Sequence, residues 1–554
     1  MTLTLILVVA ACVICFAERS VEHLKLAIAA LCFSATVLLF VVADFGRAIL
    51  LSCILAAAIS GASHVKYNHS GLKLIVTDLP LAFAGTVPFF LVQYPRTVIA
   101  VLAGGAALIL AAVAALYVRG PPVSLELQII LFSIALFSLV AAYRTSGGTV
   151  PYQRIAAQRR CFLSTFMASL LDPNSWRQFG GLALSDIAND ALPLIPAIPA
   201  RSLVYPDIIV IQHESIFDPR VYGLSVEPVV EAFLSPKNGL YGGLNVDIFG
   251  GGSWQSEFSL LTGLSSASFG SNAYFLFKRG VGRFHNSLPQ ALTALGYKTT
   301  LASSCRRNFL NYDDFYSSIG IAERLFTDDF SLPFDASRFE ATNSDALFLE
   351  AAISAHTKRI TTDTAPRFLY ALTNFNHGPH NRRLVEPGRF ERERAFATAS
   401  LSDPYYAEYY ARLAETAATW NRLKSELSDC LPKRPTLVVH YGDHQPVMTR
   451  RIEAKLRLPI DARRQFRTFY AIETLNYSAD WLNSGRGGDL DIAFLGTVTL
   501  QQAGLPLDQI FATRASLLEH CGDAYFASSS ELKRRFHRTL VETGLIEVAP
   551  TVRY

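Results

Sequence analysis

Two apolar segments in the C-terminal part of the chain run directly into side chains that bind metals. Glu214 follows the apolar run 207–212, and Asp443 and His444 follow the apolar run 436–441. Cations of the zinc or manganese type take carboxylate and imidazole ligands in proteins. These three side chains therefore form a candidate site for one divalent cation, either Mn2+ or Zn2+.

Ser253 stands at the end of a glycine-rich turn. Three glycines at 250–252 precede it, and residues 254–258 are expected to begin a helix. Glycine permits strained turns and close backbone approach, and the N-terminus of a helix attracts anions. A serine hydroxyl is a weak nucleophile until a base or a cation lowers its pKa. Ser253 is therefore the candidate nucleophile and a candidate fourth metal ligand.

Two histidines follow a third apolar run, at 367–373. His377 and His380 lie in the stretch Asn-His-Gly-Pro-His. His377 is a candidate to protonate a leaving oxygen or to hold a phosphate oxygen. His380 is a candidate phosphate ligand or an ordinary surface histidine, since histidine serves in both roles.

Each of these motifs also has an ordinary structural interpretation. A glutamate after a strand is usually a solvated cap, a run of glycines is usually a flexible turn, and Asp-His often caps a helix. A single motif remains a hypothesis until its structural context agrees. The order of the motifs and their shared position after apolar runs favour the functional interpretation.

The elements that must position these residues alternate between strands and helices. The expected strands cover 207–212, 297–302, 367–373, 436–441 and 467–472, and the expected helices cover 286–295 and 405–427. Such alternation predicts a mostly parallel sheet covered on both faces, with chemistry at the carboxyl ends of the strands. His440, inside an apolar run, is expected to be a satisfied core histidine. The tyrosines at 405, 406, 409 and 410 are expected to pack, because they follow helical spacing.

Taken in chain order, these motifs resemble the alkaline phosphatase/sulfatase superfamily, and more closely its lipoteichoic acid synthase and phosphoglycerol transferase group. The resemblance covers about residues 60–554 and includes a membrane loop at 66–79. It implies an α-helical transmembrane bundle followed by an α/β sulfatase-like (alkaline-phosphatase-like) domain with a central, mostly parallel sheet. The resemblance implies that Ser253 is the nucleophile and that His377 binds the substrate. It implies the metal ligands Glu214, Ser253, Asp443 and His444.

The chain departs from that group where the group contacts glycerol phosphate. The group's His, Trp and Arg appear here as Ser303, Leu310 and Tyr312, and its usual nucleophilic threonine is a serine. The head group is therefore left open between phosphoglycerol and phosphoethanolamine. Arg306 and Arg307 are candidates to replace the lost contact, because a guanidinium binds phosphate bidentately. Their alternative interpretation is that of solvated loop charges.

The N-terminal third has the composition of a membrane domain. The chain is 51% hydrophobic and 17% charged, and residues 1–150 hold only 8 of the 50 Lys/Arg and 5 of the 46 Asp/Glu. A spanning helix needs roughly 20 mostly apolar residues. Residues 1–145 are therefore expected to form five to six spans. The run 79–94 is the marginal one, and a signal peptide is the alternative for the run 3–17. The apolar runs lie at about 3–17, 26–43, 46–62, 79–94, 97–118 and 125–142.

Residues 146–206 are expected to link the membrane domain to a catalytic domain at 207–554. Their basic amphipathic stretch, with Arg154, Arg159 and Arg160, predicts either a packed linker helix or a helix on the lipid surface. Lys/Arg placement predicts orientation, because cytoplasmic loops carry the excess. Six spans put five such residues inside (Arg19, Lys25, Lys66, Lys73 and Arg119) and two outside (Arg47 and Arg96). The catalytic domain is thus expected on the periplasmic or extracellular side of a bacterial inner (cell) membrane.

These observations predict a metal-dependent transferase. The resemblance implies that it moves a phospho-head-group from a membrane phospholipid to an envelope glycan or lipid acceptor, through phosphorylated Ser253. The alternatives are a phosphodiesterase or sulfatase of the same superfamily, and a non-catalytic membrane scaffold. The residues after 150 carry 42 Lys/Arg against 41 Asp/Glu, so nothing predicts a nucleic-acid partner. The eight scattered cysteines leave disulfide pairing open.

Overall fold

The chain forms two compact units, Met1–Gly180 and Gly181–Tyr554, and each is described by itself. The structure is a computed structural model. It describes residues 2–18, 21–70, 73–78, 95–117, 120–145, 161–172, 175–176, 182–184, 187–307, 309–330, 345–360, 364–431, 433–459, 461, 463–523, 525 and 530–548. The division between the units falls inside the predicted linker 146–206.

The N-terminal unit is built from apolar helices. Its elements are α1 (Thr2–Ala17), α2 (Val21–Val42), α3 (Phe45–Ser70), η1 (Val76–Asp78), α5 (Pro95–Tyr117), α6 (Leu125–Thr145) and α8 (Phe162–Leu171). Four stretches in its described part are long and apolar enough to cross a membrane: His23–Val42, Phe45–Asn68, Arg96–Tyr117 and Leu125–Thr145. The helix α1 is shorter, at 16 residues. The predicted run 79–94 lies outside the described residues.

Small side chains hold these helices together while large apolar ones remain exposed. The buried cluster between the helices is rich in alanine and includes Ala27, Ala30 and Ala56, and small residues allow helices in a bilayer to approach closely. On α5, large side chains such as Leu102 and Leu110 are exposed. An apolar surface of this kind suits contact with lipid rather than with water.

The helix α8 decides between the two interpretations of the linker for residues 162–171. It packs against α2 and α3, and its first eight residues are buried. The carboxylate of Glu18, after α1, accepts hydrogen bonds from the backbone N–H and the hydroxyl of Ser164, both at 2.8 Å. This stretch is therefore a packed helix of the N-terminal unit. The three arginines at 154, 159 and 160 lie outside the described residues.

The C-terminal unit is an α/β domain around one twisted sheet. The strands are β1 (Asp207–His213), β2 (Leu240–Asn245), β3 (Lys298–Ser303), β4 (Glu323–Leu325), β5 (Arg367–Leu372), β6 (Thr436–Gly442), β7 (Arg467–Leu475), β8 (Gly485–Arg486) and β9 (Leu490–Asp491). Their order is β4-β3-β5-β1-β6-β7-β2-β8, with β9 beside β2. The five strands from β4 to β6 are parallel, and β7 is antiparallel to both of its neighbours. The predicted mostly parallel sheet is confirmed.

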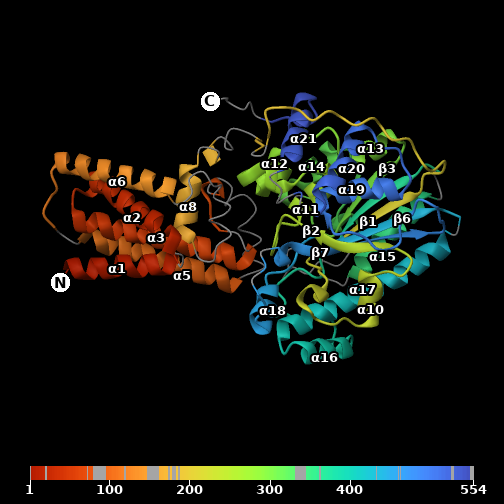
Figure 1. The fold of residues 1–554 in the computed structure, drawn as a ribbon. Coiled ribbons are helices and arrows are strands. Elements are labelled where there is room, and N and C mark those ends of the chain that lie inside the picture. Colours follow the sequence, from red (N-terminus) through yellow and green to blue (C-terminus); the bar gives the residue numbers. More distant parts are fainter. Residues whose placement is uncertain are drawn as a thin grey trace. The chain divides into compact units, whose positions relative to one another are not determined.

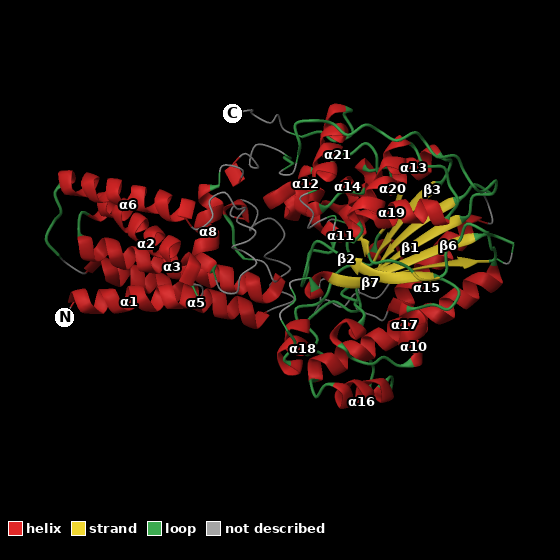
Figure 2. Ribbon diagram, viewed as in Figure 1, coloured by secondary structure: helices red, strands yellow, loops and turns green. Residues whose placement is uncertain are grey.

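Helices cover both faces of this sheet (Figures 1 and 2). The helices are α10 (Pro228–Leu234), α11 (Trp254–Thr262), α12 (Leu276–Arg279), α13 (Leu288–Ala294), α14 (Tyr312–Ser318), α15 (Asp345–Ile360), α16 (Glu391–Ser400), α17 (Pro404–Cys430), α18 (Thr449–Leu456), α19 (Ile492–Gln502), α20 (Gln509–Cys521) and α21 (Glu531–Glu542). Residues of β1 alternate between two separate cores: Ile208 and Val210 face one, and Ile209 and Ile211 face the other. The first core includes α11, α13 and α19, and the second includes α10, α15 and α17. A strand buried on both faces explains the continuous apolar run in the sequence.

The structure contains strands that the sequence pattern does not reveal. The strand β2 has the sequence LYGGLN, whose two glycines lower strand propensity. A Cβ at Gly242 would lie 2.8 Å from the carbonyl oxygen of Gly488. The glycines are therefore required by a close backbone approach. The strands β4, β8 and β9 were also missed, because segments of two or three residues carry no detectable periodicity.

Candidate active site

The register of two parallel strands places Glu214 beside Asp443. His213 and Gly442, the last residues of β1 and β6, are Cα partners. Glu214 and Asp443 are the next residue on each strand, so both leave the sheet at the same level. Carboxyl ends of parallel strands meet at one edge, where open α/β sheets bind ligands. The neighbouring strands β3 and β5 end at this edge too.

The backbone after these strands is packed so closely that only glycine fits at position 442. A Cβ on Gly442 would lie 1.8 Å from the carbonyl oxygen of Ile216. Ser215, between Glu214 and Ile216, has a φ of +56°, an uncommon conformation for a residue with a side chain. Its N–H donates to Oδ1 of Asp443 at 2.7 Å. The glycine of the Gly-Asp-His motif thus lets two loops touch and fixes the carboxylates side by side.

Glu214, Asp443 and His444 form a compact, buried trio. Each offers one ligand atom, and these atoms all lie within 4.8 Å of one another. Nε2 of His444 is 3.4 Å from Oε1 of Glu214 and 3.6 Å from Oδ2 of Asp443. Nδ1 of the same ring faces the carbonyl oxygen of Gln445 at 3.1 Å, so Nδ1 carries the hydrogen. Nε2 then presents its lone pair to the carboxylates, as a metal-binding histidine does.

The charges of the trio favour a bound cation. Burial, together with the nearby charge of Glu214, raises the pKa of Asp443 well above its usual range. Burial also acts to raise the pKa of Glu214, but electrostatic interactions with His444 and His377 and hydrogen bonds from Ser215 and Ser253 outweigh it and hold that pKa below its usual value. Oδ2 of Asp443 is buried and has no hydrogen-bond partner among the described residues. Two adjacent buried carboxylates and an unpartnered oxygen are the donor set that a divalent cation would satisfy.

Ser253 meets this trio from the glycine turn. Gly250, Gly251 and Gly252 have φ values of +82°, +145° and +93°, which residues with a Cβ rarely adopt. The Ser253 hydroxyl donates to Oε2 of Glu214 at 2.9 Å and lies 3.4 Å from Nε2 of His444. It makes no capping bond to the helix α11 that follows it. The hydroxyl is therefore directed to the trio, at the positive end of a helix that attracts anions.

A buried polar network that sequence reasoning missed holds α11 in place. Glu257, one turn after Ser253, accepts hydrogen bonds from Gln212 of β1 at 3.0 Å and from Tyr312 at 3.2 Å, and one from Tyr316. Burial raises the pKa of Glu257 to about 7. Ser253 and Glu257 are four positions apart, which places them on one face of the helix. The sequence of α11, WQSEFSLLT, mixes polar and apolar residues, so nothing in it marks Glu257 as buried.

His377 lies beside the trio, and His380 lies inside its own loop. The charge of His377 affects the pKa values of both Glu214 and His444, and its Nδ1 bonds to the carbonyl of Gly378 at 2.7 Å. His380 is only 3% exposed, and its Nε2 bonds to the carbonyl of Asn376 at 2.9 Å. The structure thus brings His377 to the candidate site, whereas His380 braces the turn that carries it.

The two arginines after β3 differ in their surroundings. Arg307 is exposed and pairs with Asp313 at 3.1 Å and Asp329 at 2.8 Å, with its guanidinium 4.8 Å from the ring centroid of Phe326. It would have to exchange one of these carboxylates for a phosphate in order to bind substrate. Arg306 is half-buried next to it. Substrate binding by either arginine stays a prediction.

His440 differs from the expected satisfied core histidine. It is fully buried in β6, but neither ring nitrogen has a hydrogen-bond partner among the described residues. Its ring lies 5.5 Å from that of His213 and 4.8 Å from that of Phe233. The surroundings are aromatic, so the ring is packed but not hydrogen-bonded, and burial lowers its pKa well below the usual value. The expected packing of the tyrosines on α17 is confirmed for Tyr406, Tyr409 and Tyr410, which are buried.

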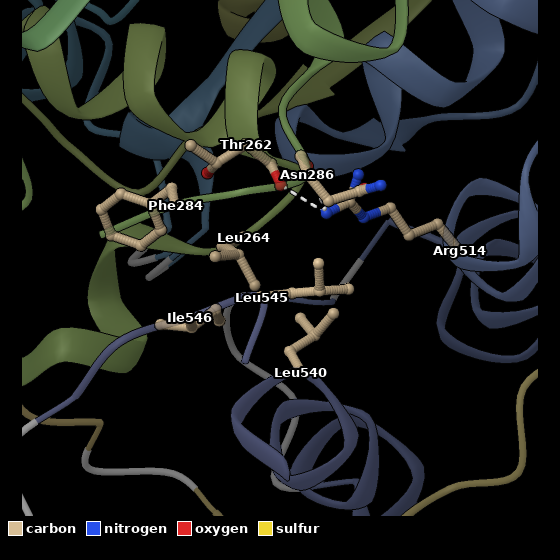
Figure 3. Close-up of a pocket in the computed structure, with 8 residues that line it drawn as sticks. All are labelled: Thr262, Leu264, Phe284, Asn286, Arg514, Leu540, Leu545 and Ile546. Carbon is tan, nitrogen blue, oxygen red and sulfur yellow. Dashed lines mark hydrogen bonds between the residues drawn. The ribbon is translucent and has the colours of Figure 1, made fainter. Parts of the chain in front are cut away.

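A small cavity elsewhere in the C-terminal unit contains none of the candidate residues (Figure 3). Its lining consists of Thr262, Leu264, Phe284, Asn286, Arg514, Leu540, Leu545 and Ile546. The Arg514 side chain is 2% exposed and donates to the carbonyl of Thr262 at 2.7 Å. The lining is largely apolar and includes no carboxylate or imidazole, so this cavity is separate from the candidate chemistry. None of the eight cysteines, all of which lie in the described part of the chain, forms a disulfide.

Comparison with known proteins identifies the fold of this unit. Residues 206–469, which include every candidate residue above, match the family model described as Sulfatase. These residues form a domain of the alkaline phosphatase/sulfatase superfamily. The predicted superfamily is therefore confirmed, as is the predicted order of an apolar helical part and a sulfatase-like α/β domain.

Individual relatives are distant. An uncharacterized protein of Haemophilus influenzae is 24% identical over 340 residues, and the chain spans 59% of that relative's length. The solved structures that are similar include the following three. The phosphoethanolamine transferase EptA of Neisseria meningitidis is 11% identical, with 88% of this chain and 96% of that chain covered, at a TM-score of 0.49. The phosphoglycerol transferase GacH of Streptococcus pyogenes is 16% identical, with 66% and 92% covered, at 0.46. The lipoteichoic acid synthase LtaP of Listeria monocytogenes is 14% identical, with 56% and 76% covered, at 0.42.

Proposed function

We propose that this protein is a metal-dependent transferase that moves phosphoglycerol or phosphoethanolamine from a membrane phospholipid to an envelope glycan or lipid. The observation that carries the proposal is the position of the Ser253 hydroxyl, 2.9 Å from Glu214 and 3.4 Å from His444. A hydroxyl directed to a cation site at a helix N-terminus is suited to attack a phosphate.

The residues divide the work of this reaction between them. Glu214, Asp443 and His444, with the Ser253 oxygen, would hold one divalent cation, Mn2+ or Zn2+. Such a cation lowers the pKa of a hydroxyl and offsets the negative charge of a phosphate. The hydrogen bond to Glu214 is the path by which the Ser253 proton leaves. His377, beside the trio, is placed to hold a phosphate oxygen or to give a proton to the leaving oxygen.

The reaction takes place in two halves. The Ser253 oxygen bonds to the phosphorus of the donor while the bond to the diacylglycerol oxygen breaks, and that oxygen takes up a proton. The oxygen of an acceptor hydroxyl then bonds to the phosphorus while the bond between phosphorus and the Ser253 oxygen breaks, and the proton that the acceptor loses restores the Ser253 hydroxyl. A serine intermediate converts one difficult transfer into two easier steps.

The membrane helices supply the reason for a lipid donor. We expect a multi-pass protein of a bacterial inner membrane whose catalytic unit faces the periplasm or the cell exterior. The loops that carry most of the Lys and Arg residues are expected in the cytoplasm, and the catalytic unit follows the last span on the other side of the membrane. A phosphatase reporter fused after residue 145 should be active, and a reporter that works only in the cytoplasm should be silent. The reverse pattern would remove the catalytic unit from the envelope acceptor.

The alternatives are distinguished by chemistry. Sulfatases generally need a Cys or Ser followed by x-Pro-x-Arg, and Ser253 is followed by Trp-Gln-Ser-Glu, which disfavours a sulfatase. A phosphodiesterase would pass the phosphoryl group to water instead of to a glycan or lipid. A scaffold has no need for a buried trio joined to a hydroxyl, so the geometry favours an enzyme.

The deciding experiment is mass spectrometry of the purified full-length protein after incubation with manganese or zinc and defined phospholipids. Phosphatidylglycerol and phosphatidylethanolamine are supplied separately. We expect an added mass on the peptide that contains Ser253, and that mass identifies the head group. Release of diacylglycerol with free head-group phosphate as the final product would indicate the phosphodiesterase. No adduct and no diacylglycerol with either lipid would contradict the proposal.

A further inference from the structure

Arg412, on the long helix α17, holds the backbone of the loop that carries His377. Its side chain is 0% exposed. Nη1 donates to the carbonyl of His377 at 3.0 Å, and Nη2 donates to the carbonyls of Arg382 at 2.7 Å and Pro379 at 3.4 Å. One planar guanidinium therefore joins three points of the loop 377–382. Arginine can do this because its donors are arranged in a rigid fork.

A buried carboxylate compensates the positive charge of Arg412 in the protein interior. Nε of Arg412 donates to Oε1 of Glu408 at 2.9 Å, and the same oxygen accepts the N–H of Leu384 at 2.8 Å. Arg394 donates to the other oxygen of Glu408 at 2.6 Å. Buried charges are stable when they are paired and hydrogen-bonded. The loop is thus held at both ends by one ion pair on α17.

The held loop is the one that places an imidazole beside the trio. The loop follows β5, whose last residue Leu372 pairs with Gln212 of β1, and the N–H of Glu214 donates to the hydroxyl of Thr373 at 3.4 Å. His377 comes four positions after Thr373, at the same edge of the sheet as Glu214. The peptide carbonyl that Arg412 holds belongs to His377 itself, so a shift of this bond moves the imidazole. A displacement of about 1 Å in a positioning contact can cost on the order of 10²-fold in rate.

We propose that Arg412 is a positioning residue that sets the place of His377 relative to Glu214, Asp443 and His444. The inference rests on the proposed function, in which His377 acts on the phosphate. Arg412 itself does not touch substrate or the metal ligands in this scheme. Its effect on catalysis therefore passes through His377, whereas its effect on the loop exists whether or not the lipid reaction takes place.

The first test measures the loop alone. Hydrogen–deuterium exchange of the full-length protein in detergent compares Arg412→Lys with Arg394→Lys. Lysine keeps the charge but cannot reach three carbonyls with one fork. We expect faster exchange of the amides of 377–384 in Arg412→Lys, by about tenfold or more, and a much smaller change in Arg394→Lys. Arg394 is a matched control, because it also pairs with Glu408. Unchanged exchange in Arg412→Lys would overturn the proposal.

The second test measures coupling to His377 by a double-mutant cycle. Fluorescently labelled phosphatidylglycerol and phosphatidylethanolamine serve as donors, and diacylglycerol release gives kcat/KM. Arg412→Lys should lower kcat/KM on the order of 10²-fold, yet lower it by less than about twofold when His377→Ala is already present. Metal content should equal that of the wild type. If Arg412→Lys folds poorly, Arg412→Gln replaces it in both tests.

The possible outcomes separate the two proposals. An equally large effect of Arg412→Lys with and without His377 would show a general structural role and overturn the positioning role. If the wild type releases no diacylglycerol from either lipid, the proposed function fails. The exchange experiment then still decides whether Arg412 holds the loop.

Discussion

The hydroxyl oxygen of Ser253 lies 2.9 Å from Oε2 of Glu214, although the two residues are 39 positions apart. Glu214 leaves the end of β1, and Ser253 enters α11 after three glycines with positive φ. The contact therefore depends on two separate features, the register of a strand and the conformation of a turn. It joins the candidate nucleophile to the candidate metal site.

Ser253→Ala should abolish head-group transfer. The change removes the attacking oxygen, so we expect a loss on the order of 10³-fold or more in diacylglycerol release. Ser253→Thr keeps a hydroxyl and should retain part of the activity. Ser259→Ala, on the same helix, is the matched control and should leave the rate close to that of the wild type. Wild-type activity in Ser253→Ala would remove Ser253 as nucleophile and favour the scaffold.

Substitution of the trio should remove the metal. Elemental analysis of the purified protein should find about one divalent ion per chain, because the site offers three side-chain ligands and a hydroxyl. Asp443→Asn and His444→Ala should each lose most of that ion, since too few ligands remain. Glu257→Gln is the control, because it changes a nearby buried carboxylate outside the trio and should keep the ion. Full occupancy in both trio variants would mean that other residues bind it.

Gly442→Ala should disrupt the metal site by moving the backbone that positions Glu214 and Asp443. The new Cβ would lie 1.8 Å from the carbonyl oxygen of Ile216, so either β6 or the loop after Glu214 must move. We expect reduced metal content, loss of transfer activity and a lower Tm. Gly488→Ala is the matched control, because nothing lies within 4 Å of its Cβ position. A fully active, metal-loaded Gly442→Ala would show that the two loops tolerate separation.

Glu257 should make the stability of the protein depend on pH. Burial raises its pKa from 4.5 to about 7, so the folded protein keeps a proton that the unfolded chain has lost. This contribution to stability is fully present below pH 4.5 and is lost as the pH rises through 7, on the order of 3 kcal/mol. Glu257→Gln cannot lose that proton.

The measurement is the Tm of the full-length protein in detergent from pH 5 to pH 8, with metal chelated so that no cation changes the charge beside Glu257. The Tm of Glu257→Gln relative to the wild type should increase across this range. The lost carboxylate hydrogen bonds lower the variant's Tm by an amount that does not depend on pH, so only the trend matters. A constant difference would place the titration of Glu257 outside this range.

The sequence alone was sufficient for the local features of this protein. Apolar runs at 207–212, 367–373 and 436–441 predicted strands that the structure contains as β1, β5 and β6. Each is buried on both faces, and such strands consist of continuous apolar residues. Glu214, Asp443 and Ser253 were candidates for a similar reason, because a polar residue directly after a buried strand or a glycine turn is a local signal. The apolar N-terminal runs were visible because a bilayer requires long uninterrupted segments.

Only the tertiary structure decided how these features meet. The pairing of His213 with Gly442 places Glu214 beside Asp443, and no periodicity within one strand can specify its partner on another. The holding of His377 by Arg412 joins positions 35 residues apart through backbone carbonyls, which are the same in every residue type and leave no trace in the sequence. The aromatic surroundings of His440 were hidden because they come from four other elements. Contacts of this kind depend on which faces of the strands and helices pack together, and that packing is determined by residues distributed over the whole chain.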